Sequence, residues 1–165
     1  MALVDLTLPN AIVLALDDLV TCMCAEVTAS GGPLCWCGLW QGETVSWDYC
    51  EECSGGACGM GWVRLVTVFP YQEFPVPAVV ARCTLPLAYQ IELGVVRCMP
   101  TADTDGNLPP PAAIAEAANI ALLDAQAMHR AMVCCSPPVI PELYTATGPQ
   151  GGCGGGAWTG YLSLD

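Results

Sequence analysis

Basic side chains are scarce in this 165-residue chain, which has four arginines, no lysine and one histidine against sixteen aspartates and glutamates. The formal net charge is −12 at pH 7. A nucleic-acid-binding surface needs clustered cations, because binding is driven by release of the counterions around the phosphates. The same charge balance argues against docking on anionic membranes. We therefore expect a chain that DNA can pass without sticking.

A long uninterrupted apolar segment is also missing, although 54% of the residues are hydrophobic. The best candidate, Ile12 to Val27, contains Asp17 and Asp18, and Asp5 stands where a signal peptide carries positive charge. This pattern predicts a protein that is made and kept in the cytoplasm, without a membrane partner. We expect its apolar side chains in one core and in interfaces.

Catalytic motifs are not evident either. His129 falls at the edge of the apolar stripe of a predicted helix, where a packed or half-exposed residue is the usual occupant. The glycine run Gly151 to Gly156 lacks the Lys-Ser/Thr ending of a phosphate-binding loop, and we interpret it as a flexible linker. The sequence therefore predicts no enzyme activity, no catalytic residue and no cofactor.

The clearest pattern present is an alternation of apolar with small or polar residues from Arg82 to Pro100. The apolar set is Cys83, Leu85, Leu87, Tyr89, Ile91, Leu93 and Val95. Period-two alternation is typical of a strand with one buried and one wet face. At about 3.3 Å per residue the strand would reach about 40 Å, a length that indicates a part in an assembly. Gln90 and Glu92 lie on its wet face, and Gly94 is a candidate bulge.

Helical periodicity predicts two helices, at Pro9 to Thr28 and at Ala112 to Cys135. The core stripe predicted for the first is Ile12, Leu16, Leu19, Val20, Met23 and Val27. The core stripe predicted for the second is Ile114, Ala118, Ala121, Ala125, Met128 and Met132, with Ile120, Leu123 and Ala127 on its back. An apolar back indicates that a neighbouring subunit covers the second helix.

Three further strands are predicted, at Leu34 to Trp40, Trp62 to Phe69 and Ala157 to Leu164. The prolines of Pro70 to Ala81 predict a projecting loop there. The resulting order is helix, strand, strand, long strand, helix, strand. It predicts one α+β domain over residues 1–165, with a four-stranded, mostly antiparallel sheet flanked by two helices.

Twelve cysteines allow several interpretations. In a reducing compartment they would be buried thiols or metal ligands, whereas an extracellular particle could form disulfides late. Cys22 and Cys24 flank the stripe of the first helix on opposite sides, so one local pairing does not serve both. Four thiolates on tight turns can hold zinc, and the candidates centre on a Cys/Gly-rich insertion over residues 41–61. The zinc candidates are Cys35, Cys37, Cys50, Cys53 and Cys58.

Three segments resemble small virion proteins of phages with GC-rich hosts, namely GGACGMGWVRLVTVFP, RCTLPLAYQIELGVVRCMP and GGCGGGAWTGYLSLD. The similar proteins are tail terminators or components of the head-to-tail connector of long-tailed phages. The predicted element order is also similar to the tail terminator fold, which assembles into a hexameric ring. The insertion over residues 41–61 is longer than a plain terminator needs.

This resemblance implies a structural protein of the virion, assembled in the host cytoplasm and placed at the head–tail junction. The ring would cap the tail tube, stop its polymerisation and dock to the head connector, while DNA crosses its lumen. Its partners would be further copies of the chain, the tail tube protein and a connector or stopper protein. The alternatives are a head-to-tail stopper, whose family is mostly a small β-barrel, and a zinc-stabilised cytoplasmic binding module.

Interface residues follow as expectations from the same resemblance. Contacts between rings are expected at Leu85 to Val95 and in the loop Pro70 to Ala81. Contacts within the ring are expected on the back of the second helix and in the last strand. The expected interface residues are Leu85, Tyr89, Gln90, Glu92, Ile120, Leu123, Trp158 and Tyr161.

Overall fold

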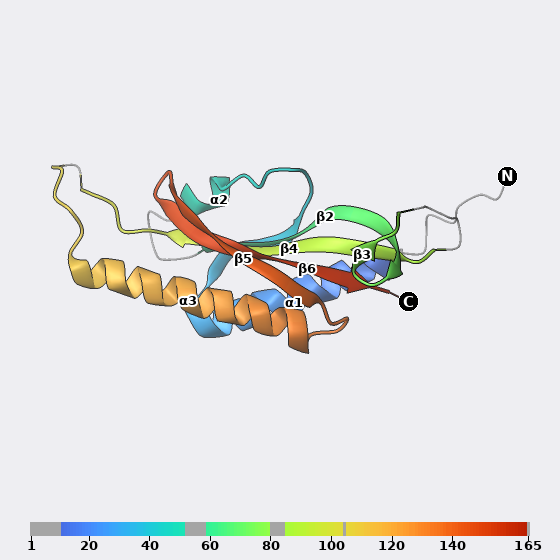
Figure 1. Cartoon of the computed structure of the whole chain (residues 1–165). Helices are drawn as coiled ribbons and strands as arrows, with labels where there is room; N and C mark the ends of the chain where they lie inside the picture. Colours follow the sequence, from blue (N-terminus) through green and yellow to red (C-terminus); the bar gives the residue numbers. More distant parts are fainter. Residues whose placement is uncertain (1–10, 52–58, 80–84, 104, 165) are drawn as a thin grey trace.

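An open sheet with two long helices on one face forms the body of the chain (Figure 1). The computed structural model describes residues 11–51, 59–79, 85–103 and 105–164. The elements are α1 (Ala11–Gly31), β1 (Leu34–Trp40), the single turn α2 (Asp48–Glu51), β2 (Gly59–Glu73), β3 (Val76–Pro77), β4 (Leu87–Cys98), α3 (Pro111–Cys134), β5 (Ile140–Gln150) and β6 (Cys153–Ser163). Among the described residues, no helix is long and apolar enough to cross a membrane.

The sheet is six-stranded, with the order β1-β2-β4-β6-β5 and with β3 paired to β2. β1 runs parallel to β2, and every other pairing is antiparallel. The α+β class is thus confirmed, but the prediction of four strands is wrong because β3 and β5 were not anticipated. β5 contains Pro141 and Pro149. It tolerates them because it is an edge strand, and one side of an edge strand makes no hydrogen bonds within the sheet.

The glycine run near the C-terminus is part of the sheet and is not a flexible linker. Gly151 and Gly152 form the turn between β5 and β6, and both have positive φ, at 58° and 84°. The following glycines lie within β6, next to β4. A Cβ at Gly155 would lie 2.0 Å from the carbonyl oxygen of Val95, so only glycine allows the two strands to approach this closely.

The main core lies between the helices and the sheet. α1 contributes Leu16, Leu19, Val20, Met23 and Val27 as predicted, together with Ala15. Opposite them, the sheet contributes Val63, Ile91, Leu93, Val95 and Leu162. The apolar residues of α1 are therefore buried because their helical spacing places them on one face, and that face packs on the sheet.

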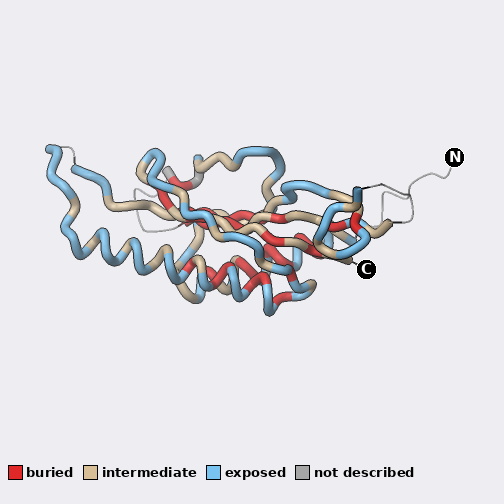
Figure 2. The backbone as a smooth tube through the Cα atoms, viewed as in Figure 1, coloured by how far each residue is buried: buried red, intermediate tan, exposed pale blue. Residues whose placement is uncertain are grey.

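The core stripe of α3 differs from the predicted one. Its buried residues are Asp124, Ala127, Met128, Ala131 and Met132, whereas Ile114 and Ala118 are exposed. Figure 2 shows that burial is confined to the C-terminal half of the helix, since the N-terminal half extends past the part that packs on the sheet. Ala127 was expected on the back of the helix but is fully buried.

The long strand β4 begins at Leu87, and residues 82–84 of the predicted strand lie outside the described residues. Its odd-numbered residues Tyr89 to Val95 pack toward the helices, as the alternation predicted. The bulge predicted at Gly94 is wrong, because the register with β6 is continuous from Ala88 to Cys98. A register shift lies instead in β2, between Leu65 and Thr67.

β2 is longer than predicted and continues through Pro70 to Glu73. Tyr71 and Glu73 then pair with β3, so the expected projecting loop is largely a β-hairpin. On the face of the sheet away from α1 and α3, a second and smaller core contains the following residues: Cys50, Met60, Trp62, Val96 and Cys153, with Trp36, Trp40, Val45 and Trp47 packed against them. Part of the Cys/Gly-rich insertion, including α2, covers this core (Figure 1).

Candidate functional site

An ion pair joins two neighbouring strands on the sheet face opposite the helices. Arg64 and Glu92 are register partners on β2 and β4, and their side chains form two bonds, at 2.7 and 2.8 Å. The indole N–H of Trp62 donates to the same carboxylate at 2.8 Å. Burial favours a higher pKa for Glu92, but the hydrogen bonds from Arg64 and Trp62 outweigh it and hold that pKa below its ordinary value. This carboxylate therefore stays ionised and structurally engaged.

A second polar cluster lies on the same face at β5 and β6. The carboxylate of Glu142 accepts hydrogen bonds from the side chains of Gln90, Thr159 and Tyr161. The bond from Tyr161, at 2.8 Å, raises the pKa of that phenol because the carboxylate favours its protonated form. Together with Arg64 and Glu92, these residues give the sheet a polar face whose side chains are largely hydrogen-bonded to one another.

Several of the expected interface residues make contacts within the chain. Gln90 and Glu92 lie on the wet face as predicted, but each is bonded within the chain. Tyr89 and Trp158 pack against the main core, and the indole of Trp158 donates to the carbonyl of Ala125 at 2.9 Å. Both side chains are half-buried. The last strand, β6, lies between β4 and β5, so it has no open edge to offer a neighbour.

Helix α3 places the remaining expected contact residues at different depths. Leu123 is 42% exposed and its neighbour Leu122 is 63% exposed, whereas Ile120 is half-buried and lines a cleft. His129 is exposed, and its ring contacts that of Trp158 in a tilted arrangement, with 5.3 Å between ring centroids. The position is on a helix as predicted, but it is more exposed than the packed or half-exposed residue that the sequence indicated.

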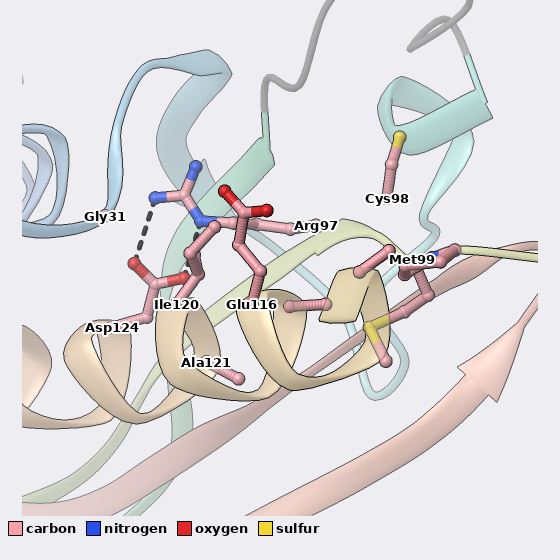
Figure 3. Close-up of a pocket in the computed structure, with 11 residues that line it drawn as sticks. Gly31, Arg97, Cys98, Met99, Glu116, Ile120, Ala121 and Asp124 are labelled. Atoms are coloured by element: carbon pink, nitrogen blue, oxygen red, sulfur yellow. Dashed lines mark hydrogen bonds and ion pairs between the residues drawn. The ribbon is translucent and has the colours of Figure 1, made fainter. Parts of the chain in front are cut away.

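A cleft of about 370 Å³ opens between the end of α1, the end of β4 and the first half of α3 (Figure 3). The buried ion pair of Arg97 and Asp124 forms one side of it, with bonds of 2.6 and 2.9 Å. Glu116 and Ile120 extend from α3 beside this pair, and Met99 lies across from them. Most of the remaining lining is alanine and other apolar side chains.

The guanidinium of Arg97 links three elements at this cleft. Besides Asp124 on α3, it donates to the carbonyls of Gly32 and Pro33, which follow α1, at 3.1 and 3.0 Å. Burial of Asp124 raises the pKa of its carboxyl above the ordinary value, and the charge of Arg97 opposes this only in part. With its donors committed to protein acceptors, Arg97 is suited to holding the fold together. The sequence analysis missed this pair, although a lone aspartate within an apolar helical stretch was a signal for it.

The outer edge of β2 is an exposed, apolar part of the sheet. β1 pairs with β2 only as far as Arg64, and no described strand pairs with the outer edge over the next four residues. Those residues, Leu65 to Val68, are all exposed, and Leu65, Val66 and Val68 have exposed fractions of 38%, 41% and 42%. This segment, called the β2 edge below, carries neither lysine nor proline, the residues that commonly protect sheet edges.

The cysteines form disulfides in the described part of the chain. Cys22 is bonded to Cys135, Cys24 to Cys37 and Cys50 to Cys153. Cys22 and Cys24 thus have separate partners, as their opposite positions on α1 indicated. Cys35 and Cys98 are also disulfide-bonded, whereas Cys134 is an exposed free thiol.

Disulfides change the interpretation of the zinc candidates. Cys35, Cys37 and Cys50 are all bonded, and a disulfide sulfur is not a thiolate ligand. Cys53 and Cys58 lie outside the described residues. The three described members of the predicted set are therefore not thiolate ligands in this oxidised structure.

Comparison with protein families, curated proteins and solved structures finds no match for this chain.

Proposed function

We propose that this chain is the subunit of a ring that caps the tail tube of a long-tailed phage, that is, a tail terminator. The observation that carries the proposal is the β2 edge, where Leu65 to Val68 present apolar side chains and unpaired backbone in one place. An exposed apolar edge is a template for pairing with a strand of another chain. Because proteins commonly protect such edges, an unprotected edge supports a role in assembly.

The charge distribution supports a lumen through which DNA passes. Every arginine in the described residues is committed to an ion pair, namely Arg64 with Glu92, Arg97 with Asp124 and Arg130 with Glu26. Among the described residues, no basic side chain other than His129 is left to balance the remaining carboxylates, since the chain contains no lysine. Such a surface repels phosphates, so DNA would cross the ring without being retained.

The architecture also supports a terminator over a stopper. A terminator-like chain is expected to carry two helices on a largely antiparallel open sheet, and α1 and α3 lie together on one face of such a sheet. The stopper family is mostly a small β-barrel. The open edges of β2 and β5 are difficult to reconcile with a closed barrel.

Contacts within the ring follow from the two edges. β5 closes the opposite side of the sheet and exposes Ile140 and Leu143, at 50% and 61%. We place the β2 edge of one subunit against β5 of the next, because such head-to-tail pairing closes into a ring. This replaces the expected role of the last strand. Leu122 and Leu123 of α3 would flank the contact, and the ring would meet the tail tube and connector through its two rims.

A strand-edge variant tests the assembly. Val68→Lys places a charge in the β2 edge and should convert a ring into monomers, because an inserted lysine blocks strand addition. Leu108→Lys is the matched control, since Leu108 is 84% exposed in the loop before α3. Light scattering after size exclusion and negative-stain microscopy give the readout. A wild-type chain that stays monomeric at every concentration and on purified tail tubes would contradict the proposal.

Phage particles that lack the protein separate the two virion roles. Loss of a terminator should give tails of uncontrolled, excessive length, because nothing stops tube polymerisation. Loss of a stopper should instead give normal tails that are not joined to heads. Normal tail length would therefore favour the alternative of a connector protein.

A further inference from the structure

Three cysteines from three separate elements meet in the second core. Cys98 and Cys153 are direct register partners at the ends of β4 and β6, and Cys50 lies in α2 above them. The three sulfurs all lie within 4.8 Å of one another, and the sulfur of Cys98 is 3.3 Å from the carbonyl oxygen of Cys50. Figure 3 shows the Cys98 side chain pointing toward α2, while Cys98 also belongs to the lining of the cleft beside Arg97.

The three sulfurs are close enough for a metal–thiolate centre once the disulfide between Cys50 and Cys153 is reduced and its two sulfurs separate. Thiolates at about 2.3 Å from a zinc ion in tetrahedral geometry stand about 3.8 Å apart. Cys50 and Cys153 are only 1% and 2% exposed, and Cys98 is half-buried, so one side of the cluster remains accessible. The surrounding tryptophans and Met60 give the apolar shell that strengthens metal–thiolate bonding.

Oxidation state decides whether these sulfurs can bind a metal. The disulfide between Cys50 and Cys153, and the one that includes Cys98, describe the oxidised chain. If the chain is assembled in a host cytoplasm, as the proposed function requires, dithiol reductants there keep cysteines as thiols. We propose that in the reduced chain Cys50, Cys98 and Cys153 together bind one zinc ion, with water as the fourth ligand.

The exchange between the two states balances as follows. Each disulfide takes up two electrons and two protons from a dithiol, which is itself oxidised to a disulfide, and two thiols form. Zinc then displaces the thiol protons of the three ligands, and these protons pass to solvent. Later thiol–disulfide exchange with a small-molecule disulfide passes two electrons to that disulfide, which becomes two thiols, for each protein disulfide formed, and the ion is released. Zinc would thus fasten α2 to the ends of β4 and β6 before the disulfides do.

Cobalt titration of the reduced full-length chain tests the site. The chain is reduced with a dithiol, desalted without oxygen and titrated with Co²⁺, whose thiolate charge-transfer and tetrahedral d–d bands report the ligands. We expect saturation that depends on Cys98, and displacement of cobalt by Zn²⁺. Cys98→Ser should remove at least a third of the charge-transfer intensity. Cys134→Ser is the matched control and should leave it unchanged, because Cys134 is an exposed free thiol.

Folding is followed in the same samples by far-UV circular dichroism. A reduced chain that unfolds without metal and refolds with one equivalent supports the site, since binding energy is then folding energy. Binding that is unaffected by Cys98→Ser would overturn the proposal. So would a chain that binds no cobalt, folded or not. These results do not depend on ring formation, so failure of the site and failure of the terminator proposal are distinguishable.

Discussion

Trp62 on β2 packs directly against Gly94, its register partner on β4. A Cβ at Gly94 would lie 2.0 Å from Cζ2 of the indole, which is closer than any side chain allows. The indole is 4% exposed and its N–H donates to Glu92. The absent side chain of Gly94 therefore lets Trp62 fill the second core and position the carboxylate that pairs with Arg64.

Gly94→Ala should destabilise the chain by about 1–3 kcal/mol, because the added methyl group displaces a packed indole. Urea unfolding followed by tryptophan fluorescence measures the loss. Gly148→Ala is the matched control: no atom lies within 4 Å of a Cβ built there, and it is expected to be nearly neutral. Equal stability of the two variants would contradict this account of Gly94.

Hydrophobic periodicity predicted the elements that bury one regular face. β1 and most of α1 follow from it, as does the alternation of Tyr89 to Val95 on β4, because in each a single side packs on the main core. β5 could not be predicted in this way. Its prolines and its exposed side chains on both faces belong to an edge strand, and edge position is set by the rest of the sheet.

The buried pair of Arg97 and Asp124 should be far more sensitive than the surface pair of Arg130 and Glu26. The side chains of the first pair are 11% and 6% exposed, and those of the second are 45% and 41% exposed. Asp124→Asn leaves the guanidinium of Arg97 without its counterion and should cost about 3–5 kcal/mol. Glu26→Gln should cost at most about 1 kcal/mol.

Replacing both members of the buried pair separates two causes of lost stability. One is the loss of their attraction, and the other is the burial of a charge without its partner. Arg97→Met with Asp124→Leu should cost less than Asp124→Asn alone, because no buried charge is left behind. Denaturant unfolding of the three variants gives the comparison. A double variant less stable than the single one would show that the bonds of Arg97 to Gly32 and Pro33 matter more than the pair itself.

Candidate sites were harder to predict than elements for a related reason. Sequence spacing brought together cysteines that are near one another along the chain, from Cys35 to Cys58. The described cluster instead combines Cys50 with Cys98 and Cys153, which come from different strands and a helical turn. Only the register of β4 with β6 places the last two side by side, and no local spacing contains that information.

Glu92 should make the folded state sensitive to acid. Its pKa lies below the ordinary value of 4.5 in the folded chain, so its ionised form contributes stability above about pH 4.5. That contribution is lost as the pH falls through the lowered pKa. Glu92→Gln should therefore lower stability at pH 7 and flatten the fall in stability below pH 4.5. Unfolding free energies between pH 3 and pH 7 test this.

One control variant and one opposing carboxyl group bear on the acid experiment. Glu26→Gln should leave the shape of the pH profile close to that of the wild type, because its pair is exposed. Asp124 acts in the opposite direction: its pKa is raised, so its ionisation costs stability as the pH rises above 3.8. An unchanged acid slope in Glu92→Gln would show that other carboxylates govern it.

The two disulfides of α1 should differ in their contribution to stability. Cys22–Cys135 joins α1 to the end of α3 across 113 residues, whereas Cys24–Cys37 spans 13 residues. Chain entropy predicts about 3 kcal/mol for a loop of about 15 residues and about 4.7 kcal/mol for one of about 100. Even with Cys50–Cys153 intact, the loop that Cys22–Cys135 closes is the longer one. The double variant C22S/C135S should thus unfold at lower urea concentration than C24S/C37S.

Unfolding is measured on oxidised protein without reductant, and mass spectrometry verifies the remaining disulfides. Cys134→Ser is the control, since its thiol is free and exposed beside Cys135, and it should leave the midpoint unchanged. If Cys134 can replace its neighbour, Cys135→Ser alone will show a new Cys22–Cys134 bond and a smaller loss. A larger loss in C24S/C37S would contradict the entropic order, and would mean that the link from α1 to β1 stabilises the native core directly.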